Sequence, residues 1–128
     1  LAQEKEVKLV EESEELVMTG SDILIYRMIY NLVENAIKYN HVGGQVLVKA
    51  AQKDTDIVIE IEDTGNGISE EFRERVFEPF FRVDKSRSRA LGGVGLGLAM
   101  VREIVRVHDG KISIKENEYG GTTFEVVL

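Results

Sequence analysis

The stretch of residues 23–40 holds a group of polar side chains that could do chemistry. Asn31, Asn35, Lys38 and Tyr39 fall on one sector of a predicted helix, because residues three or four positions apart share a face. Asparagine is only a moderate helix former, so helix propensity does not explain the pair. An amide oxygen suits a hard cation such as Mg²⁺, and an ammonium group can neutralise a phosphate. The alternative is a polar helix edge that bonds only to its own protein.

Two glycine-rich stretches and one basic segment are further candidates for a ligand site. Asp63 begins a stretch over residues 63–68 in which two glycines follow a predicted strand, and glycine lets another group approach the backbone closely. Residues 92–97 hold four glycines before a predicted helix, whose first amide groups attract anions. Residues 82–89 hold four basic side chains against one acid. Ordinary glycine turns and a solvated loop are the plain alternatives.

The composition limits the class of protein. The chain has 128 residues, a net charge of -7 and no cysteine. One core suffices for this length, and the lack of a broad basic footprint argues against binding to nucleic acid. Disulfides and thiolate metal sites are excluded. Because no apolar run reaches the ~20 residues of a membrane span, we expect one soluble domain over residues 1–128.

Hydrophobic periodicity predicts the elements that must position these residues. The predicted strands are residues 6–10, 15–18, 46–51, 57–62, 111–115 and 123–128, and the predicted helices are residues 23–40, 69–77 and 98–108. An acidic turn is expected between the first two strands. Because strands come in pairs, the order favours a two-layer α/β sandwich, with about three helices on one face of a mixed, mainly antiparallel sheet.

The first helix carries the apolar stripe that must cover the sheet. Its members recur every three or four residues and need a core to bury them. They are Ile25, Met28, Ile29, Leu32 and Ala36. Ser21 or Asp22 is expected to be the N-cap, because both side chains can accept a hydrogen bond from the first turn.

Five stretches together resemble the sequence boxes of the ATP-binding catalytic domain of bacterial sensor histidine kinases. That superfamily also includes gyrase, the heat-shock chaperone ATPase and mismatch-repair ATPases. The matching stretches are residues 31–39 (asparagine box), 63–68 (first glycine box), 77–82 (phenylalanine box), and 93–98 and 121–124 (remaining glycine boxes). They stand in the family's order, and the likeness covers the chain from about residue 20 to residue 128. It implies a Bergerat-type ATP-binding fold with ATP and Mg²⁺ as ligands.

The resemblance implies a role for each matching residue. Asp63 would accept a hydrogen bond from the adenine amino group, and Thr123 would complete the adenine-side network through its hydroxyl. Asn35 would ligate Mg²⁺, and Arg82 would offset charge on the γ-phosphate, which makes these two the candidate catalytic residues. Residues 83–95 would form a lid over the nucleotide. The other nucleotide-binding candidates are Asn31, Lys38, Tyr39, Gly65, Gly67, Ile68, Gly93, Gly95, Leu96, Gly97 and Leu98.

The residue type at position 31 distinguishes two reaction types, hydrolysis of ATP and transfer of its phosphoryl group. In superfamily members that hydrolyse ATP the matching residue is commonly a glutamate that activates water, and an amide cannot accept that proton. Glu34 points about 60° away on the helix and does not replace it. Transfer of the γ-phosphoryl group to a protein histidine is therefore the leading hypothesis. The alternatives are an anti-sigma-type serine kinase, a hydrolysing ATPase, and a nucleotide-sensing interaction module on the same fold.

The phosphoacceptor is expected outside this chain. The chain's two histidines lie in a predicted loop and at a predicted helix end, whereas the family's acceptor lies in a separate helical hairpin. The implied partners are therefore the protein's own dimerisation and phosphohistidine domain and a response regulator. We expect no nucleic-acid partner and no membrane contact by this stretch. We also expect it to be a cytoplasmic monomer, at the cytoplasmic end of a membrane-bound sensor that forms homodimers.

Overall fold

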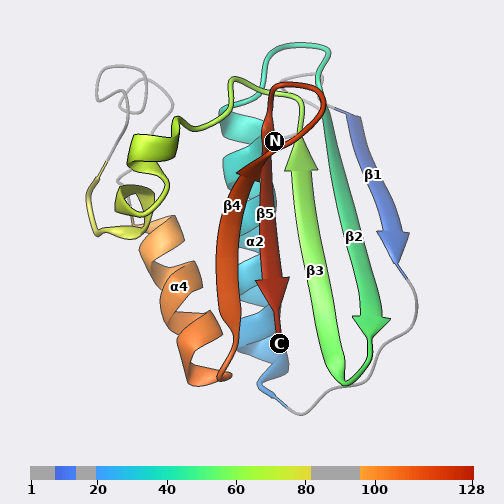
Figure 1. The fold of residues 1–128 in the computed structure, drawn as a ribbon, viewed down its shortest axis with the longest axis vertical. Coiled ribbons are helices and arrows are strands. Elements are labelled where there is room, and N and C mark those ends of the chain that lie inside the picture. The colour runs from blue at the N-terminus through green and yellow to red at the C-terminus, as the bar shows by residue number, and fades with distance from the viewer. Residues whose placement is uncertain (1–7, 14–19, 82–95) are drawn as a thin grey trace.

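Two layers, a sheet and a set of helices on one of its faces, make up the described part of the chain (Figure 1). The computed structural model describes residues 8–13, 20–81 and 96–128, the first range by its backbone alone. The strands are β1 (Lys8–Ser13), β2 (Gln45–Lys53), β3 (Asp56–Asp63), β4 (Lys111–Glu116) and β5 (Thr122–Val127). The helices are α2 (Asp22–Lys38), α4 (Gly97–Val107) and two short 3-10 turns, η1 (Glu70–Phe72) and η2 (Arg75–Phe77). The predicted two-layer α/β sandwich is confirmed.

The sheet is mixed and mainly antiparallel, as predicted. Its strand order is β1-β2-β3-β5-β4, in which only β1 and β2 run parallel. Strands β2 and β3 form the predicted hairpin, and Asp54 in its turn has a φ of 56°. Along β3, side chains alternate between the two faces: Ile57, Ile59 and Ile61 join the core under the helices. Glu60 and Glu62 therefore lie on the outer face, the side of the sheet away from the helices.

Helix α2 covers the middle of the sheet. It begins at Ser21, whose Oγ accepts a hydrogen bond from the Leu24 N–H at 3.3 Å, so the predicted N-cap is confirmed. The predicted stripe faces inward, and its members Met28, Leu32 and Ala36 are fully or almost fully buried. Burial of this stripe holds the polar edge of the helix at the border of the core.

Helix α4 packs beside α2 through its own buried face. Val101, Ile104 and Val105 on this helix are buried in the same core as the inner side of the sheet. Phe77 of η2 meets Phe124 of β5 edge to face, with ring centroids 6.3 Å apart. One continuous core therefore links both helices, the phenylalanine stretch and the sheet.

A histidine joins the start of α2 to the end of α4. The Ser21 N–H donates to His108 Nε2 at 3.1 Å, and His108 Nδ1 lies 2.8 Å from the Ile104 carbonyl oxygen. Both contacts are satisfied by a neutral imidazole with its proton on Nδ1. The ring therefore fixes the two helix ends against each other.

Two local predictions are wrong. The predicted helix over residues 69–77 is a pair of 3-10 turns, and the expected cap, Ser69, makes no capping hydrogen bond through its side chain. A segment this short gains little from helix propagation, so contacts decide its path: the Arg73 Nε–H donates back to the Ile68 carbonyl, and Phe77 turns into the core. The expected acidic turn is also absent, since residues 11 and 12 lie within β1. The predicted strand over residues 15–18 lies outside the described residues.

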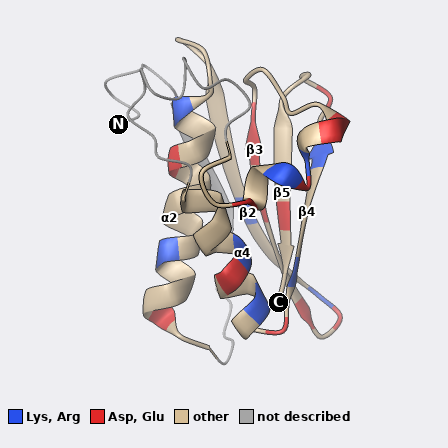
Figure 2. Cartoon of the chain, turned by 90° about the vertical axis from the view of Figure 1, so that its left-hand side faces the viewer, with Lys and Arg blue, Asp and Glu red and all other residues tan. Residues whose placement is uncertain are grey.

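Charges of both signs are scattered over the described surface, without a broad patch of one sign (Figure 2). Lys49 on β2, for example, lies 3.6 Å from the Glu62 carboxylate on β3. Such a surface offers a polyanion no extended positive face. Within the described ranges, no helix combines the length and apolar character needed to cross a membrane.

We predict that Leu32→Ala lowers the free energy of unfolding by about 2 to 5 kcal/mol, because it leaves a cavity in the core. Leu32 has no exposed surface. Ile23 is 69% exposed on the same helix, so Ile23→Ala is the matched control and should change stability by less than about 0.5 kcal/mol. Chemical denaturation of the three proteins measures both values. Equal losses would contradict the described packing of α2.

Candidate functional site

Three segments meet at one end of the molecule. The carboxyl ends of α2 and β3 and the turn between β4 and β5 lie together there (Figure 1). The meeting point is Asp63, the last residue of β3, which is 8% exposed. The polar edge of α2 leads to the same end, so the structure brings together the asparagine box and two of the glycine boxes.

The Asp63 carboxylate is held by backbone amides. Its Oδ1 accepts hydrogen bonds from the Gly65 N–H at 2.9 Å and from the Thr122 N–H at 3.2 Å. Burial raises the pKa of this carboxyl above its ordinary value of 3.8, and the two amide hydrogen bonds act in the opposite direction. Because both amides bind Oδ1, the carboxylate has one fixed orientation toward the end of the sheet.

Two glycines allow this close approach. A side-chain carbon on Gly121 would overlap the carbonyl group of Asp63, and one on Gly65 would lie 2.7 Å from the Tyr39 carbonyl oxygen. Any other residue at these positions would push the β5 start or the α2 end away from Asp63. The glycine boxes therefore act here as points of backbone contact around one carboxylate.

Asn40 fastens the end of α2 and was missed as a functional residue by the sequence analysis. It is fully buried, its Nδ2 donates to the Gln45 carbonyl at 3.0 Å, and its Oδ1 accepts from the His41 N–H at 2.9 Å. The Thr64 hydroxyl also donates to Oδ1, at 3.3 Å. The amide thereby joins the helix end to β2 and to the segment after Asp63. The available signal was a third asparagine directly after the asparagine box.

The polar edge of α2 lies beside the start of α4. The Asn31 Nδ2 donates to the Met100 Sδ at 3.6 Å, and Asn31 Oδ1 would lie 3.7 Å from a side-chain carbon placed on Gly97. Asn35 lies one turn further along the same helix and is half-buried. The Lys38 ammonium lies 3.1 Å from the Glu34 carboxylate. The three predicted polar residues therefore share one edge of α2, and Asn31 lies beside Gly97, the end of the chain's second glycine-rich stretch.

The remaining candidates surround this centre or lie outside the described residues. The Tyr39 N–H closes α2 by donating to the Asn35 carbonyl at 3.2 Å. Gly67 has a φ of 74°, Ile68 packs on the core, and Leu98 packs on the same core at the start of α4. Leu96 and Gly97 form the exposed beginning of that helix. The candidates that fall outside the described residues are Arg82, Gly93, Gly95 and the predicted lid over residues 83–95.

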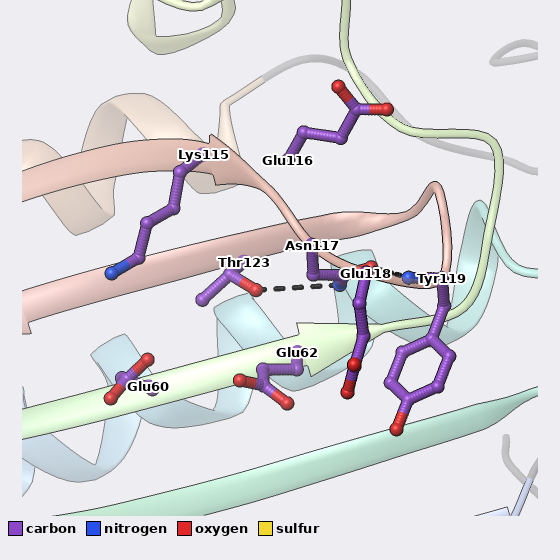
Figure 3. Close-up of a pocket in the computed structure, with 8 residues that line it drawn as sticks. All are labelled: Glu60, Glu62, Lys115, Glu116, Asn117, Glu118, Tyr119 and Thr123. Carbon is purple, nitrogen blue, oxygen red and sulfur yellow. Dashed lines mark hydrogen bonds between the residues drawn. The ribbon is translucent and has the colours of Figure 1, made fainter.

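Thr123, predicted to join the adenine-side network, lies on the face of the sheet opposite to the Asp63 side chain. Thr123 pairs with Glu62 and Lys115 in the sheet, so its side chain lies with theirs on the outer face. All three line a shallow hollow of about 270 Å³ there (Figure 3). Thr122, one residue earlier, shares the inner side with Asp63 and binds it through its N–H. Side chains alternate along a strand, so a shift of one residue moves the candidate to the opposite face.

Asn35 is suited to a magnesium ion that takes few ligands from protein. Within residues 20–81 and 96–128, no group of three or more His, Cys, Asp or Glu side chains is placed to hold a metal. Mg²⁺ in phosphate sites commonly keeps one or two protein ligands and completes its octahedron with water and phosphate oxygens. A single half-buried amide oxygen on the polar edge of α2 fits that kind of site.

Curated relatives of this chain are sensor kinases. It is 43% identical over 113 residues to the sensor-like histidine kinase SenX3 of Mycobacterium tuberculosis, covering 88% of this chain and 28% of the relative. It is 44% identical over 96 residues to the signal transduction histidine-protein kinase ArlS of Staphylococcus aureus, covering 75% of this chain and 21% of the relative. The chain thus spans about a quarter of the length of these relatives.

Solved structures and a family model agree with these relatives. The mycobacterial sensor histidine kinase MprB matches with a TM-score of 0.87 and 28% identity, over 99% of this chain and 85% of that one. Full-length ShkA in complex with AMPPNP matches with a TM-score of 0.81 and 26% identity, over 98% of this chain and 26% of that one. The model of the histidine kinase-, DNA gyrase B- and HSP90-like ATPases matches residues 20–128. A match over that much of its length shows that the chain belongs to this ATPase family.

Proposed function

We propose that this chain is the ATP-binding catalytic domain of a two-component sensor histidine kinase. It binds Mg·ATP and transfers the γ-phosphoryl group to a histidine on a separate dimerisation domain. The observation that carries the proposal is the buried Asp63 carboxylate, which two backbone amides fix at the end of the sheet. The relatives described above are named as histidine kinases, and one matching structure is a complex with AMPPNP.

Asp63 recognises the base. With Oδ1 bound to two amides, its second oxygen is oriented to accept a hydrogen bond from the exocyclic amine of adenine. Guanine and hypoxanthine carry a carbonyl oxygen at the matching ring position, which would face a buried carboxylate without a proton between them. The Tyr39 backbone lies close to Gly65, and Ile68 packs on the core. We propose that both side chains line the base.

The edge of α2 and the start of α4 bind the phosphates. Asn35 supplies its amide oxygen to Mg²⁺, while Asn31 and Lys38 lie near the phosphate oxygens. Leu96 stands at the N-cap of α4, and its side chain cannot accept hydrogen bonds from the first turn. The first amide groups of that helix, which the Leu96 side chain does not cap, are therefore suited to an anion. Bound Mg²⁺ would neutralise part of the phosphate charge.

The side chains favour transfer over hydrolysis. The Asn31 amide cannot take a proton from water, and the Glu34 carboxylate is paired with Lys38 at 3.1 Å. A histidine nitrogen of the partner domain would attack the γ-phosphorus, the bond to the bridging oxygen would break, and ADP would leave. Arg82 offsets the negative charge that shifts during this step.

The rest of the proposed system lies in other domains and proteins. The relatives are about four times as long as the matched stretch, which leaves room for a dimerisation domain with the acceptor histidine. A response-regulator aspartate then receives the phosphoryl group. We propose that this domain is a cytoplasmic monomer by itself, and that the complete sensor is a dimer at the membrane.

Phosphotransfer to an added helical hairpin domain tests the function. The chain, Mg²⁺ and γ-labelled ATP are mixed with the purified hairpin domain of a matching sensor kinase. We expect label on the hairpin, and none when its acceptor histidine is replaced by alanine. Steady ATP hydrolysis without label on the hairpin would support the hydrolase, and tight adenine binding without either reaction would support the interaction module.

We predict that substitutions at two predicted site residues separate binding from transfer. Asp63→Asn should weaken ADP binding by about 10- to 100-fold, because a buried hydrogen bond to a charged acceptor is lost. Arg82→Ala should leave ADP affinity within about twofold and slow transfer by about 100-fold or more. Glu62→Gln, next to Asp63 on the outer face, is the matched control. Equal losses of ADP affinity in the two site variants would contradict the proposal that Arg82 acts in transfer and not in binding.

We also predict a pH dependence that comes from Asp63. The adenine amine needs the ionised carboxylate, so ADP affinity should fall as the pH drops through the raised pKa of Asp63, above its ordinary 3.8. The folded chain holds this proton to a higher pH than the unfolded chain. Asp63 therefore lowers the free energy of unfolding as the pH rises through the same window. Calorimetry on wild type and Asp63→Asn measures how ADP affinity and the free energy of unfolding depend on pH. Both dependences should be absent in the variant.

A further inference from the structure

Asn117, in the turn between β4 and β5, uses both ends of its amide. Its Nδ2 donates to the Asp63 carbonyl oxygen at 2.9 Å, and a weaker contact to Thr123 Oγ1 is 3.4 Å long. Its Oδ1 accepts from the Tyr119 N–H at 3.0 Å (Figure 3). The same oxygen accepts from the Gly121 N–H at 3.1 Å. The side chain thus joins the turn to the last residue of β3, which is 54 positions away in sequence.

The bond from Asn117 to Asp63 lies beyond the end of the sheet ladder. The last paired residues of β3 and β5 are Glu62 and Thr123. Asp63 and Thr122 stand one step further, where strand pairing does not hold the two segments together. The contacts that hold them are the Thr122 N–H on the carboxylate and the Asn117 amide on the carbonyl.

The same amide controls the residue next to Thr122. The Gly121 N–H is bound to Asn117 Oδ1, and Gly121 is in such close contact with the Asp63 carbonyl group that a side-chain carbon would not fit. The peptide group that follows Gly121 carries the Thr122 N–H. A shift of the turn would therefore move this N–H away from Asp63 Oδ1 and free the carboxylate to rotate.

We propose that Asn117 is a positioning residue that sets the base specificity of the site. Its amide holds the Gly121 and Thr122 backbone against Asp63, and so determines how strongly the Asp63 carboxylate prefers adenine. Asn117 itself acts from behind the strand end and does not touch the base. The inference rests on the proposed function, because it concerns recognition of adenine by Asp63.

The Oδ1 and Nδ2 atoms of the Asn117 amide have different roles, which substitutions can separate. The hydrogen bonds to Oδ1 close a local turn of a kind that Asp or Ser can also close. The bond from Nδ2 to Asp63 is not needed for the turn and requires a donor. Asn117→Asp therefore keeps the acceptor and removes the donor. Asn117→Ser adds no charge; it removes the Nδ2 amine and keeps a hydroxyl, on a shorter side chain, that can still accept from the turn. Glu118→Gln changes an exposed residue of the same turn and is the control.

The test compares ADP with IDP, in which the amino group is replaced by oxygen. Displacement of a fluorescent nucleotide from the 128-residue chain gives both dissociation constants. We expect Asn117→Asp and Asn117→Ser to weaken ADP about tenfold and leave IDP unchanged, because an oriented buried hydrogen bond is lost only for adenine. Glu118→Gln should match wild type. An unchanged ratio of ADP to IDP affinity in both variants would overturn the proposal.

A measurement without nucleotide separates positioning from general destabilisation. In the free chain, ¹³C NMR follows the titration of the Asp63 carboxyl. We expect a higher pKa in Asn117→Ser than in wild type, because the Thr122 N–H no longer stabilises the ionised form. An unchanged titration would overturn the proposal even if the melting temperature fell. If wild type itself shows no preference for ADP over IDP, the proposed function fails as well, whereas a preference that the variants keep counts against Asn117 alone.

Discussion

The contact between Asp63 and the start of β5 is the constraint on which the site depends. A carboxylate buried at a strand end is unfavourable unless hydrogen bonds satisfy it, and here the Gly65 and Thr122 amides do so. Those amides can come this close only because residues 65 and 121 are glycine. The result is a negative acceptor in one fixed orientation, in a setting where a missing donor on a ligand would be costly.

Helix α2 is fixed at both ends, and this places its polar edge. At its start, His108 accepts the Ser21 N–H, and at its end Asn40 donates to the Gln45 carbonyl. Between them the apolar stripe is buried on the sheet, so the helix cannot rotate without exposing Leu32 and its neighbours. Asn31 is therefore held beside the first turn of α4. The polar groups of the proposed phosphate site are positioned by the core rather than by each other.

The polar groups along α2 determine which chemistry the family fold can support in this chain. Hydrolysis needs a base for water, whereas phosphotransfer needs charge stabilisation and an external nucleophile. Here Asn31 is an amide, and the nearby Glu34 forms an ion pair with Lys38. Under the proposed function, the domain supplies nucleotide recognition and charge, and a separate domain supplies the acceptor. This division agrees with a chain that spans about a quarter of its relatives.

The sequence alone determined the hairpin of β2 and β3, the strands β4 and β5, and the amphipathic helix α2, because periodicity and turn residues act over a few neighbours. Only the tertiary structure decided which threonine meets Asp63, since strand alternation is fixed by pairing with Glu62 and Lys115. It also brought Asn117 into contact with Asp63, through a hydrogen bond between residues far apart in sequence. The sequence does not show which group an asparagine side chain will bind, because the partner can be far away along the chain. Such contacts are therefore known only once the sheet has brought the two residues together.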